Sequence, residues 1–325
     1  MSDRSGRVAV VGSFNVDHVW ECARLPQPGE TLEGRYATGP GGKGFNQAIA
    51  ARRAGADAIF LCALGDDPGA ALARSLAAAD GLALRVRASD AATGTAGIYV
   101  DESGRNCILI GPGANAALDP EFVEAQADAL RAADVVLAQL ESPQTAISAA
   151  LRTARDAGRI TILNPAPANA RPGAALLALA DVLTPNESEL AALLASHAGE
   201  QVEASAVALM ASERLHGLCR ELLPAGSVVV TLGGAGCFVS HPDDRRRGDD
   251  RGWYRVAAER AEVRDTTGAG DAFSGALAAA LALGLAPFAA CVRFAGRYAA
   301  LSTERAGAAL SMPGLADLAA RFADA

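Results

Sequence analysis

Residues 265–277, DTTGAGDAFSGAL, place nearly bare backbone beside a carboxylate at the expected start of a helix. The backbone N–H groups of Gly268, Ala269 and Gly270 can approach an anion, and the helix N-terminus adds positive potential there. Asp271 would repel that anion unless it accepts a proton from a hydroxyl group that attacks a phosphate. From these residues alone, a base for phosphoryl transfer and a helix-capping aspartate remain equally open.

A second glycine loop, GPGGKGFNQA, covers residues 39–48. It is not a Walker loop, because Gly44 rather than Ser or Thr follows Lys43. Gly42 permits close backbone approach, while Lys43 and Asn46 offer hydrogen-bond donors that suit a polyhydroxyl ligand. The alternative interpretation is a tight turn that leads into a helix.

Three further loops carry polar residues or glycines where strands are expected to end. In GSFNVD (12–17), Asn15 and Asp17 share one side of an extended segment and could hold vicinal hydroxyls, although an Asx turn is the common alternative. In TPNESE (184–189), Asn186 and Glu189 have the spacing of a capping box, and could also lie near metal-bound phosphates through water. TLGGAG (231–236) is a glycine turn that would fit a nucleotide.

The elements that must position these loops alternate between strand and helix. Repeated βα units predict an α/β fold with three layers, a mostly parallel central sheet and helices on both faces. Two segments, 31–39 and the hairpin 93–115, do not alternate with helices, and we expect them in a small side sheet. The predicted strands are 7–17, 58–65, 134–141, 159–167, 180–187 and two within 227–240, and the predicted helices are 43–55, 68–81, 119–132, 143–157, one from Glu187, 204–222 and most of 270 onward.

Composition narrows the class of protein. The 325 residues carry a formal net charge of −8, which argues against a nucleic-acid partner. The six cysteines, at 22, 62, 107, 219, 237 and 291, form no C-x-x-C pair and are expected to be small buried side chains in a reducing, cytoplasmic compartment. Residues 272–292 lack charge, but Gly284 and Pro287 predict two buried helices there rather than a membrane span.

In their order along the chain, these motifs resemble those of the PfkB carbohydrate kinases, which have the ribokinase-like fold. GGKGFNQAIAARRAGA (41–56) and DTTGAGDAFSGAL match the two signatures of the family, and the likeness extends over about residues 8–320. The resemblance implies a single kinase domain over 1–325, with a lid sheet formed by about 16–40 and 93–113. It also implies a homodimer that forms through this lid.

The resemblance further implies roles for individual residues. Asp271 matches the general base, and Gly268, Ala269 and Gly270 match the anion hole. The sugar-contacting positions correspond to Asn15, Asp17, Gly42, Lys43, Asn46, Glu141 and Asp271. The nucleotide positions correspond to Asn186, Thr231, Gly233, Gly236, Gly270 and Gly296, with Glu189 linked to Mg²⁺ through water. A monovalent cation, usually K⁺, would lie at Asp265, Thr267, Ser302, Arg305, Gly307 and Ser311.

The activity implied by the resemblance is ATP-dependent phosphorylation of D-ribose at O5, and the alternative acceptors are deoxyribose, another sugar or a nucleoside. Two residues depart from the family pattern: Phe45 replaces a small residue near the sugar, and Gly296 replaces a His or Asn beside adenine. A non-catalytic sugar or nucleotide sensor would be expected to lose the base or the anion hole, and both are present. A dinucleotide-dependent oxidoreductase would need G-x-G-x-x-G after the first strand, where the chain has VVGSFN.

Overall fold

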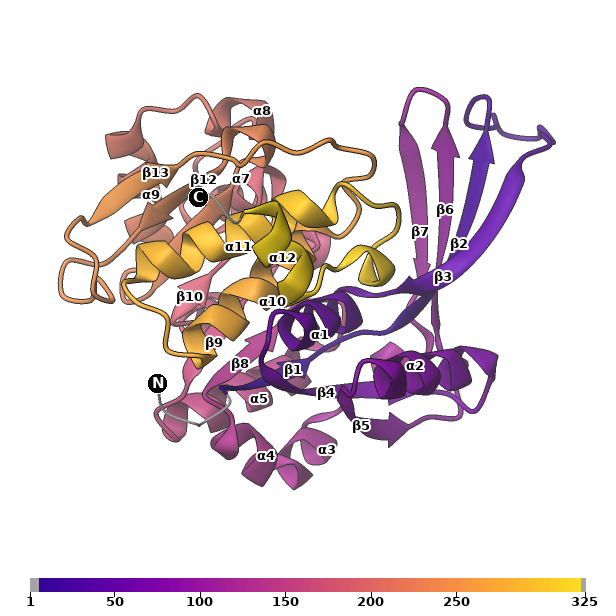
Figure 1. Cartoon of the computed structure of the whole chain (residues 1–325), viewed down its shortest axis with the longest axis horizontal. Helices are drawn as coiled ribbons and strands as arrows, with labels where there is room; N and C mark the ends of the chain where they lie inside the picture. Colours follow the sequence, from indigo (N-terminus) through magenta and orange to yellow (C-terminus); the bar gives the residue numbers. More distant parts are fainter. Residues whose placement is uncertain (1–5, 323–325) are drawn as a thin grey trace.

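The framework of the protein is a nine-stranded sheet in the order β13-β12-β11-β10-β9-β8-β1-β4-β5 (Figure 1). The strands from β5 to β11 pair in parallel, whereas β12 runs antiparallel to β11 and β13 antiparallel to β12. This computed structural model describes residues 6–322; the predicted domain range 1–325 also includes 1–5 and 323–325, which lie outside the described residues. The strands are β1 (Arg7–Val11), β4 (Asp57–Leu64), β5 (Ala83–Ala88), β8 (Val135–Ala138), β9 (Ile160–Leu163), β10 (Val182–Leu183), β11 (Ser227–Thr231), β12 (Cys237–Ser240) and β13 (Trp253–Val256).

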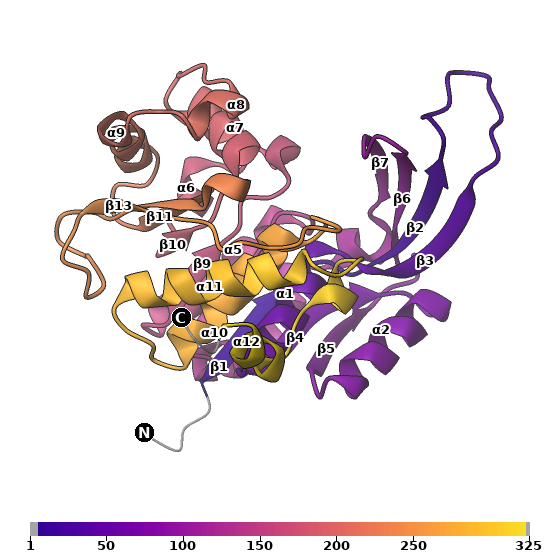
Figure 2. The same ribbon diagram turned by 45° about the horizontal axis from the view of Figure 1, so that its top comes forward.

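Helices cover both faces of this sheet, so the sheet is the middle of three layers (Figure 2). Successive residues of β1 alternate between the two hydrophobic cores: Val8 and Val10 face one core, and Ala9 and Val11 face the other. The first core is completed by α1 (Lys43–Arg53), α2 (Pro68–Ala79), α10 (Ala269–Ala282), α11 (Phe288–Ser302) and α12 (Leu315–Arg321). The second is completed by α3 (Pro120–Ala125), α4 (Ala127–Ala132), α5 (Gln144–Asp156), α6 (Ala174–Leu177), α7 (Glu187–His197), α8 (Ala204–Val207) and α9 (Ser212–Leu222).

A separate four-stranded sheet projects from the carboxyl ends of the central strands (Figure 1). Its order is β3-β2-β6-β7, with β2 (Asn15–Cys22), β3 (Arg35–Gly41), β6 (Gly94–Asp101) and β7 (Asn106–Gly111). Because β2 follows β1 after three residues, the side sheet is joined directly to an interior strand of the main sheet. The predicted fold class, α/β/α with a small side sheet, is confirmed.

Most predicted elements are present, with differences in detail. The predicted helices 119–132 and 204–222 are each two helices, α3 with α4 and α8 with α9. The sequence does not predict strands β5 and β13, because both lie at sheet edges and neither contains a fully buried residue, so their sequences lack a buried apolar run. Gly284 and Pro287 do separate α10 from α11, and no helix in the described range is both long and apolar enough to cross a membrane. Cys107 is exposed on β7, so the expectation of buried cysteines is wrong at that position.

The direction of chain progression reverses between β1 and β8. From β1 the chain adds β4 and β5 on one side, and then returns to add β8 and the later strands on the other side. In open α/β sheets, ligands bind beyond the carboxyl ends of the strands at such a switch point. The sheet order therefore places a binding site above β1 and β8, beside the root of the side sheet.

Candidate active site

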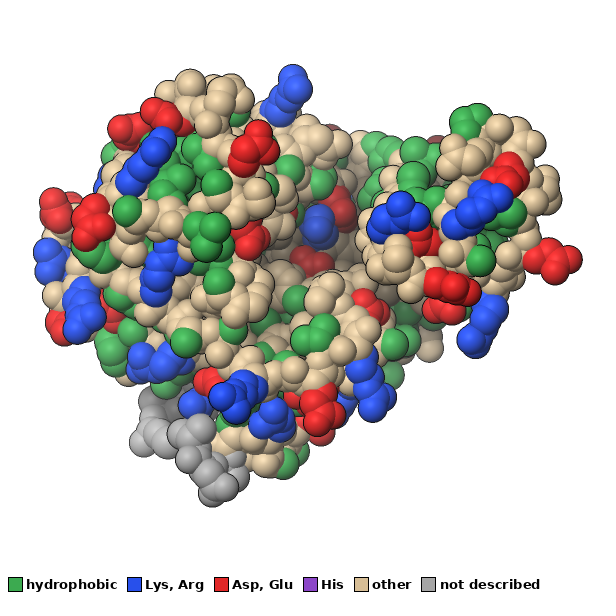
Figure 3. Space-filling view, turned by 90° about the horizontal axis from the view of Figure 1, so that it is seen from above, with side chains coloured by type: hydrophobic (Ala, Val, Ile, Leu, Met, Phe, Trp, Pro, Cys, Tyr) green, Lys and Arg blue, Asp and Glu red, His purple; other side chains and the backbone are tan. Residues whose placement is uncertain are grey.

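A hollow lies at this edge, between the body of the protein and the side sheet (Figure 3). Acidic side chains and a basic side chain are visible at its floor. Within the hollow is a cavity of about 130 Å³, large enough for a phosphoryl group. Its lining comes from the N-terminus of α1, from the carboxyl ends of β9, β10 and β11, and from the starts of α7 and α10: Lys43, Asn164, Ala166, Thr184, Asn186, Glu189, Thr231, Thr266, Gly268, Ala269, Gly270 and Asp271.

The start of α10 supplies backbone N–H groups to the cavity. Gly268, the residue before the helix, has a φ of 76°, which an L side chain would adopt only with strain. This conformation turns the chain from the 264–267 loop into the helix. The Ala269 N–H donates to the Thr266 carbonyl over 3.2 Å, and the Ala272 N–H donates to the Gly268 carbonyl over 2.8 Å. Gly270 and Asp271 lie between them, in the helix turn that lacks intrahelical acceptors.

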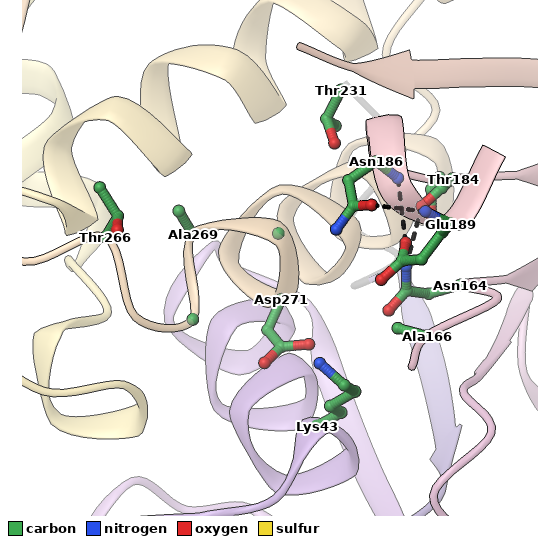
Figure 4. A pocket seen from close by; sticks show the side chains of 12 residues that line it. Lys43, Asn164, Ala166, Thr184, Asn186, Glu189, Thr231, Thr266, Ala269 and Asp271 are labelled. Carbon is green, nitrogen blue, oxygen red and sulfur yellow. Dashed lines mark hydrogen bonds between the residues drawn. The ribbon is translucent and has the colours of Figure 1, made fainter. Parts of the chain in front are cut away.

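Asp271 is buried at the floor of the cavity and faces α1. Figure 4 shows its carboxylate and the Lys43 side chain directed toward each other. The Asn46 Nδ2 donates to Asp271 Oδ2 over 2.9 Å, and the Gln47 Nε2 donates to Asp271 Oδ1 over 2.8 Å. Burial raises the pKa of Asp271 above its ordinary value, although Lys43 and the two amides favour the charged form. A carboxylate that is buried, ionisable and held by donors at the edge of a cavity can act as a proton acceptor.

Lys43 is the cation among the acidic groups of the site. Burial lowers its pKa, but Asp271, Glu141 and Glu189 outweigh that effect and leave the pKa above its ordinary value. Lys43 is therefore charged at neutral pH, and its positive charge compensates the surrounding carboxylates. The Lys43 backbone N–H also donates to Glu141 Oε2 over 3.0 Å.

The residues expected to contact sugar gather at the root of the side sheet. Gly42 has a φ of 85°, and a Cβ there would lie 2.7 Å from the Asn15 nitrogen, so only glycine lets α1 begin against the start of β2. Asp17 projects from β2, two residues after Asn15 and on the same face of the strand. Burial, together with the charges of Glu141 and Asp271, raises the pKa of Asp17 to about 7.

Two polar residues that the sequence did not single out hold this group in place. Asn115 is buried and donates through Nδ2 to Asn15 Oδ1 over 2.8 Å, while its Oδ1 accepts from the Phe14 N–H. The Ser13 Oγ donates to Glu141 Oε2 over 2.6 Å. The GPGAN motif around Asn115 could have indicated the former, but nothing in the local pattern identifies its partner 100 residues away.

On the opposite side of the cavity, Asn186 and Glu189 form the predicted capping box at α7. The Asn186 Oδ1 accepts from the Glu189 N–H, and Glu189 Oε2 accepts from the Asn186 N–H, each over 2.9 Å. Both residues also line the cavity, so their role in capping α7 leaves a role at the cavity open to them (Figure 4). Burial raises the pKa of Glu189, against the Asn186 hydrogen bond and the Lys43 charge.

The expected nucleotide positions lie on two elements. Thr231 ends β11 and lines the cavity, and Gly233 and Gly236 form the turn into β12 with positive φ. Gly296 lies in the middle of α11, where an added Cβ would meet no atom within 4 Å. The structure therefore has open space beside Gly296 on this helix.

The positions expected to hold a monovalent cation lie in neighbouring loops. The Arg264 and Asp265 N–H groups donate to the Thr303 carbonyl, and the Asp265 carboxylate accepts from the N–H groups of Thr267 and Gly307. Burial raises the pKa of Asp265, but these hydrogen bonds outweigh it and keep the pKa below its ordinary value. Ser302 and Ser311 are buried, whereas the Arg305 side chain turns away to Asp317.

Phe45 does not lie in the sugar region. Its side chain is 1% exposed and packs edge-on against Phe14, with the ring centroids 5.0 Å apart, and beside Phe60 in the core. The bulk of Phe45 is thus accommodated beneath the loop, behind the residues expected to bind sugar.

Comparison with known proteins gives one consistent family. The model of the pfkB family carbohydrate kinases matches residues 5–315. A bifunctional ribokinase/ribose-5-phosphate isomerase A of Fructilactobacillus sanfranciscensis is 39% identical over 94% of this chain, which spans only 54% of that relative's length. The ribokinase of Staphylococcus aureus is 34% identical over 95% of this chain and 97% of its own. The solved structure of Arabidopsis thaliana ribokinase complexed with ribose and ATP superposes with a TM-score of 0.82, at 29% identity, over 97% of this chain and 98% of its own.

Proposed function

Because the chain belongs to the pfkB family of carbohydrate kinases, we propose that it transfers the terminal phosphoryl group of ATP to O5 of D-ribose, giving ribose 5-phosphate and ADP. The observation that carries this proposal is the position of Asp271. Its buried carboxylate lies between a cavity of phosphoryl size and the polar groups of the β2 root.

The proposed reaction is an in-line displacement. The sugar O5 forms a bond to the γ-phosphorus, its proton moves to Asp271, and the bond from that phosphorus to the bridging oxygen breaks with the electron pair leaving on ADP. The N–H groups at the start of α10, with Gly268–Gly270 forming the turn, would stabilise the charge on the moving phosphoryl group. Asn15, Asp17, Gly42, Lys43, Asn46 and Glu141 would hold the sugar hydroxyl groups.

We assign the nucleotide to Asn186, Thr231, Gly233, Gly236, Gly270 and Gly296. In the described residues, no three His, Cys, Asp or Glu side chains are grouped to hold a metal ion by themselves. A Mg²⁺ ion would therefore be held mainly by ATP phosphates and water, with Glu189 and Asn186 as outer partners, and would offset phosphate charge. A K⁺ ion would take mainly backbone carbonyl oxygens as ligands, and we assign it to the segments of Asp265, Thr267, Ser302, Arg305, Gly307 and Ser311.

We further propose that the side sheet closes over the sugar as a lid and forms a homodimer. By the strand register, Tyr36, Tyr99 and Leu109 lie on one face of this sheet and are 55%, 37% and 77% exposed, and an exposed apolar surface of this kind supports an interface. Light scattering should give the mass of two chains. A Leu109→Lys variant, which places a charge on that surface, should shift the mass toward one chain.

The test of the proposed activity is a coupled assay of ADP release. Ribose, deoxyribose, fructose and adenosine are compared as acceptors, each with and without K⁺. We expect ribose to have the highest kcat/KM and K⁺ to raise it. Activity on adenosine but not on ribose would overturn the substrate assignment, and equal activity without K⁺ would overturn the cation assignment.

A further inference from the structure

Behind the Asp271 carboxylate lies a chain of buried amide side chains that the proposed reaction does not use. The Gln47 Nε2 donates both to Asp271 Oδ1, over 2.8 Å, and to Asn164 Oδ1, over 3.0 Å. The Gln47 Oε1 in turn accepts from the Gln139 Nε2 over 2.6 Å. Gln47 and Gln139 are both completely buried. Neither lines the cavity, so neither is placed to touch sugar or phosphate.

The carboxylate sets the orientation of every amide in this chain. An ionised carboxylate only accepts hydrogen bonds, so Gln47 must present its NH₂ group to Asp271. Its carbonyl oxygen must then face Gln139, which must supply an NH₂ group. Because the same Gln47 NH₂ group also donates to Asn164, Asn164 must present its side-chain oxygen to Gln47. Its NH₂ group then points the other way and donates to the Thr184 carbonyl over 2.8 Å. The network therefore presents only donors to Asp271, which matches the ionised form of its carboxylate.

The other carboxylate oxygen has a less permanent partner. Asn46, which donates to Asp271 Oδ2, is one of the residues assigned to the sugar, and its Oδ1 is buried without a partner among the described residues. A sugar hydroxyl could therefore engage Asn46 and change its contact with Asp271. Gln47 has no such competing ligand, because its amide is fixed on both sides by protein groups.

We propose that Gln47 is a positioning residue, which holds the Asp271 carboxylate ionised and in the orientation that receives the sugar proton, and that Gln139 fixes the Gln47 amide from behind. This inference rests on the proposed role of Asp271 as the base. Through Asn164, which lines the cavity, the same amide also joins the base to the strand ends that face the phosphate.

The decisive variant is Gln47→Met, which keeps the length of the side chain and removes its hydrogen bonds. A hydrogen bond to a charged group corresponds to about a 10- to 100-fold effect. We expect kcat to fall by that factor and KM for ribose to change less than about threefold, because Gln47 is not placed to touch the sugar. Gln144→Met is the matched control, since Gln144 donates to the Ala170 carbonyl over 2.7 Å away from the cavity; its kcat should equal that of the unmodified protein.

The dependence of kcat on pH separates positioning from a general loss of structure. The Gln47 donor favours the ionised form of Asp271, so its removal should raise the pKa of this base, and kcat should fall by a larger factor at about pH 6 than at about pH 8. The charged groups that act on Asp271 are Lys43, Glu141, Glu189 and Asp17, and all remain in the variant. A fall in kcat by the same factor at both pH values would overturn the proposal.

Gln139→Met provides a second test if Gln47→Met does not fold. Without its partner the Gln47 amide can rotate, so we expect a smaller fall in kcat with the same bias toward low pH. Unchanged kcat at both pH values would overturn the role of Gln139. Failure of the proposed function is distinguishable, because then the unmodified protein would not phosphorylate ribose, or Asp271→Asn would phosphorylate it equally fast. An active unmodified protein, an inactive Asp271→Asn and a pH-independent Gln47→Met would reject this inference alone.

Discussion

The substitution Asp271→Asn tests the proposed chemistry with little disturbance of the fold. The asparagine has the same shape, and its Oδ1 can still accept from Gln47. Its Nδ2 would then face Asn46, whose Oδ1 is unpartnered and can turn to accept from it. Every hydrogen bond at this position therefore has a replacement, and what is lost is the negative charge and with it the ability to take up a proton.

The expected loss of activity follows from the role of a positioned base. Such a base contributes about 10²–10⁴ in rate, or about 3–5 kcal/mol of activation free energy. Stability should not fall in parallel. Because burial raises the pKa of Asp271 in the folded state, its ionisation opposes folding near neutral pH. Replacing it by a neutral amide should leave the melting temperature at about pH 8 unchanged or higher.

The assay combines three measurements on the same preparation. ADP release gives kcat, calorimetric titration gives ribose affinity, and a thermal melt gives stability. We expect kcat to fall at least 100-fold while ribose binding stays measurable. The melting temperature should equal or exceed that of the unmodified protein. A fall in kcat of less than about tenfold would refute the assignment of Asp271 as the base, and a large drop in the melting temperature would refute the hydrogen-bond replacement.

Experiments at four further positions test other parts of the structure. Since the pKa of Asp17 is raised to about 7, this side chain becomes protonated as pH falls below that value, and KM for ribose should then rise by up to about tenfold per pH unit. An Asp17→Asn variant should show a high KM that does not depend on pH in this way. Gly296→Ala should raise the free energy of unfolding by ~0.5–1 kcal/mol in denaturant titrations, because its Cβ meets no atom within 4 Å in α11. In contrast, Gly275→Ala in α10 should lower it by ~1–3 kcal/mol, because that Cβ would lie 2.5 Å from the Gln47 carbonyl oxygen; equal effects at the two glycines would contradict the packing described. Asn115→Ala should cost ~1–3 kcal/mol in a thermal or denaturant melt, since the Phe14 N–H and carbonyl lose their partner, and should raise KM for ribose more than it lowers kcat.

Local sequence patterns were sufficient for much of the fold. Buried runs such as that of β1, and glycine stops such as Gly55 after α1, identified most strands and helices. Strands β5 and β13 were missed because an edge strand buries few side chains, so its apolar periodicity is weak. The sequence predicts the helices 119–132 and 204–222 as continuous, because helix propensity does not record where a turn interrupts an alanine-rich segment.

The candidate site was predictable to the extent that its groups lie in short motifs. Asn186 and Glu189 form a capping box and also line the cavity. Their spacing in the sequence predicts the capping box and allows a role near phosphate as the alternative. Asn164, Thr184 and Thr266 line the cavity without having been singled out, because each is an isolated polar residue beside a strand or loop. Phe45 could not be placed from sequence, since its direction into the core depends on where Phe14 and Phe60 pack.

The sequence by itself determined which chemical groups are available to the site: a glycine turn before a helix, an aspartate in the first turn of that helix, and polar groups after several strands. Only the tertiary structure decided which of these groups meet. Gln47 and Asp271 are 224 residues apart, and Asn115 and Asn15 are 100 residues apart, yet each pair shares a buried hydrogen bond. The physical reason is that local spacing fixes direction within one element, whereas contacts between elements follow from the strand order and from burial that leaves no water to satisfy these groups.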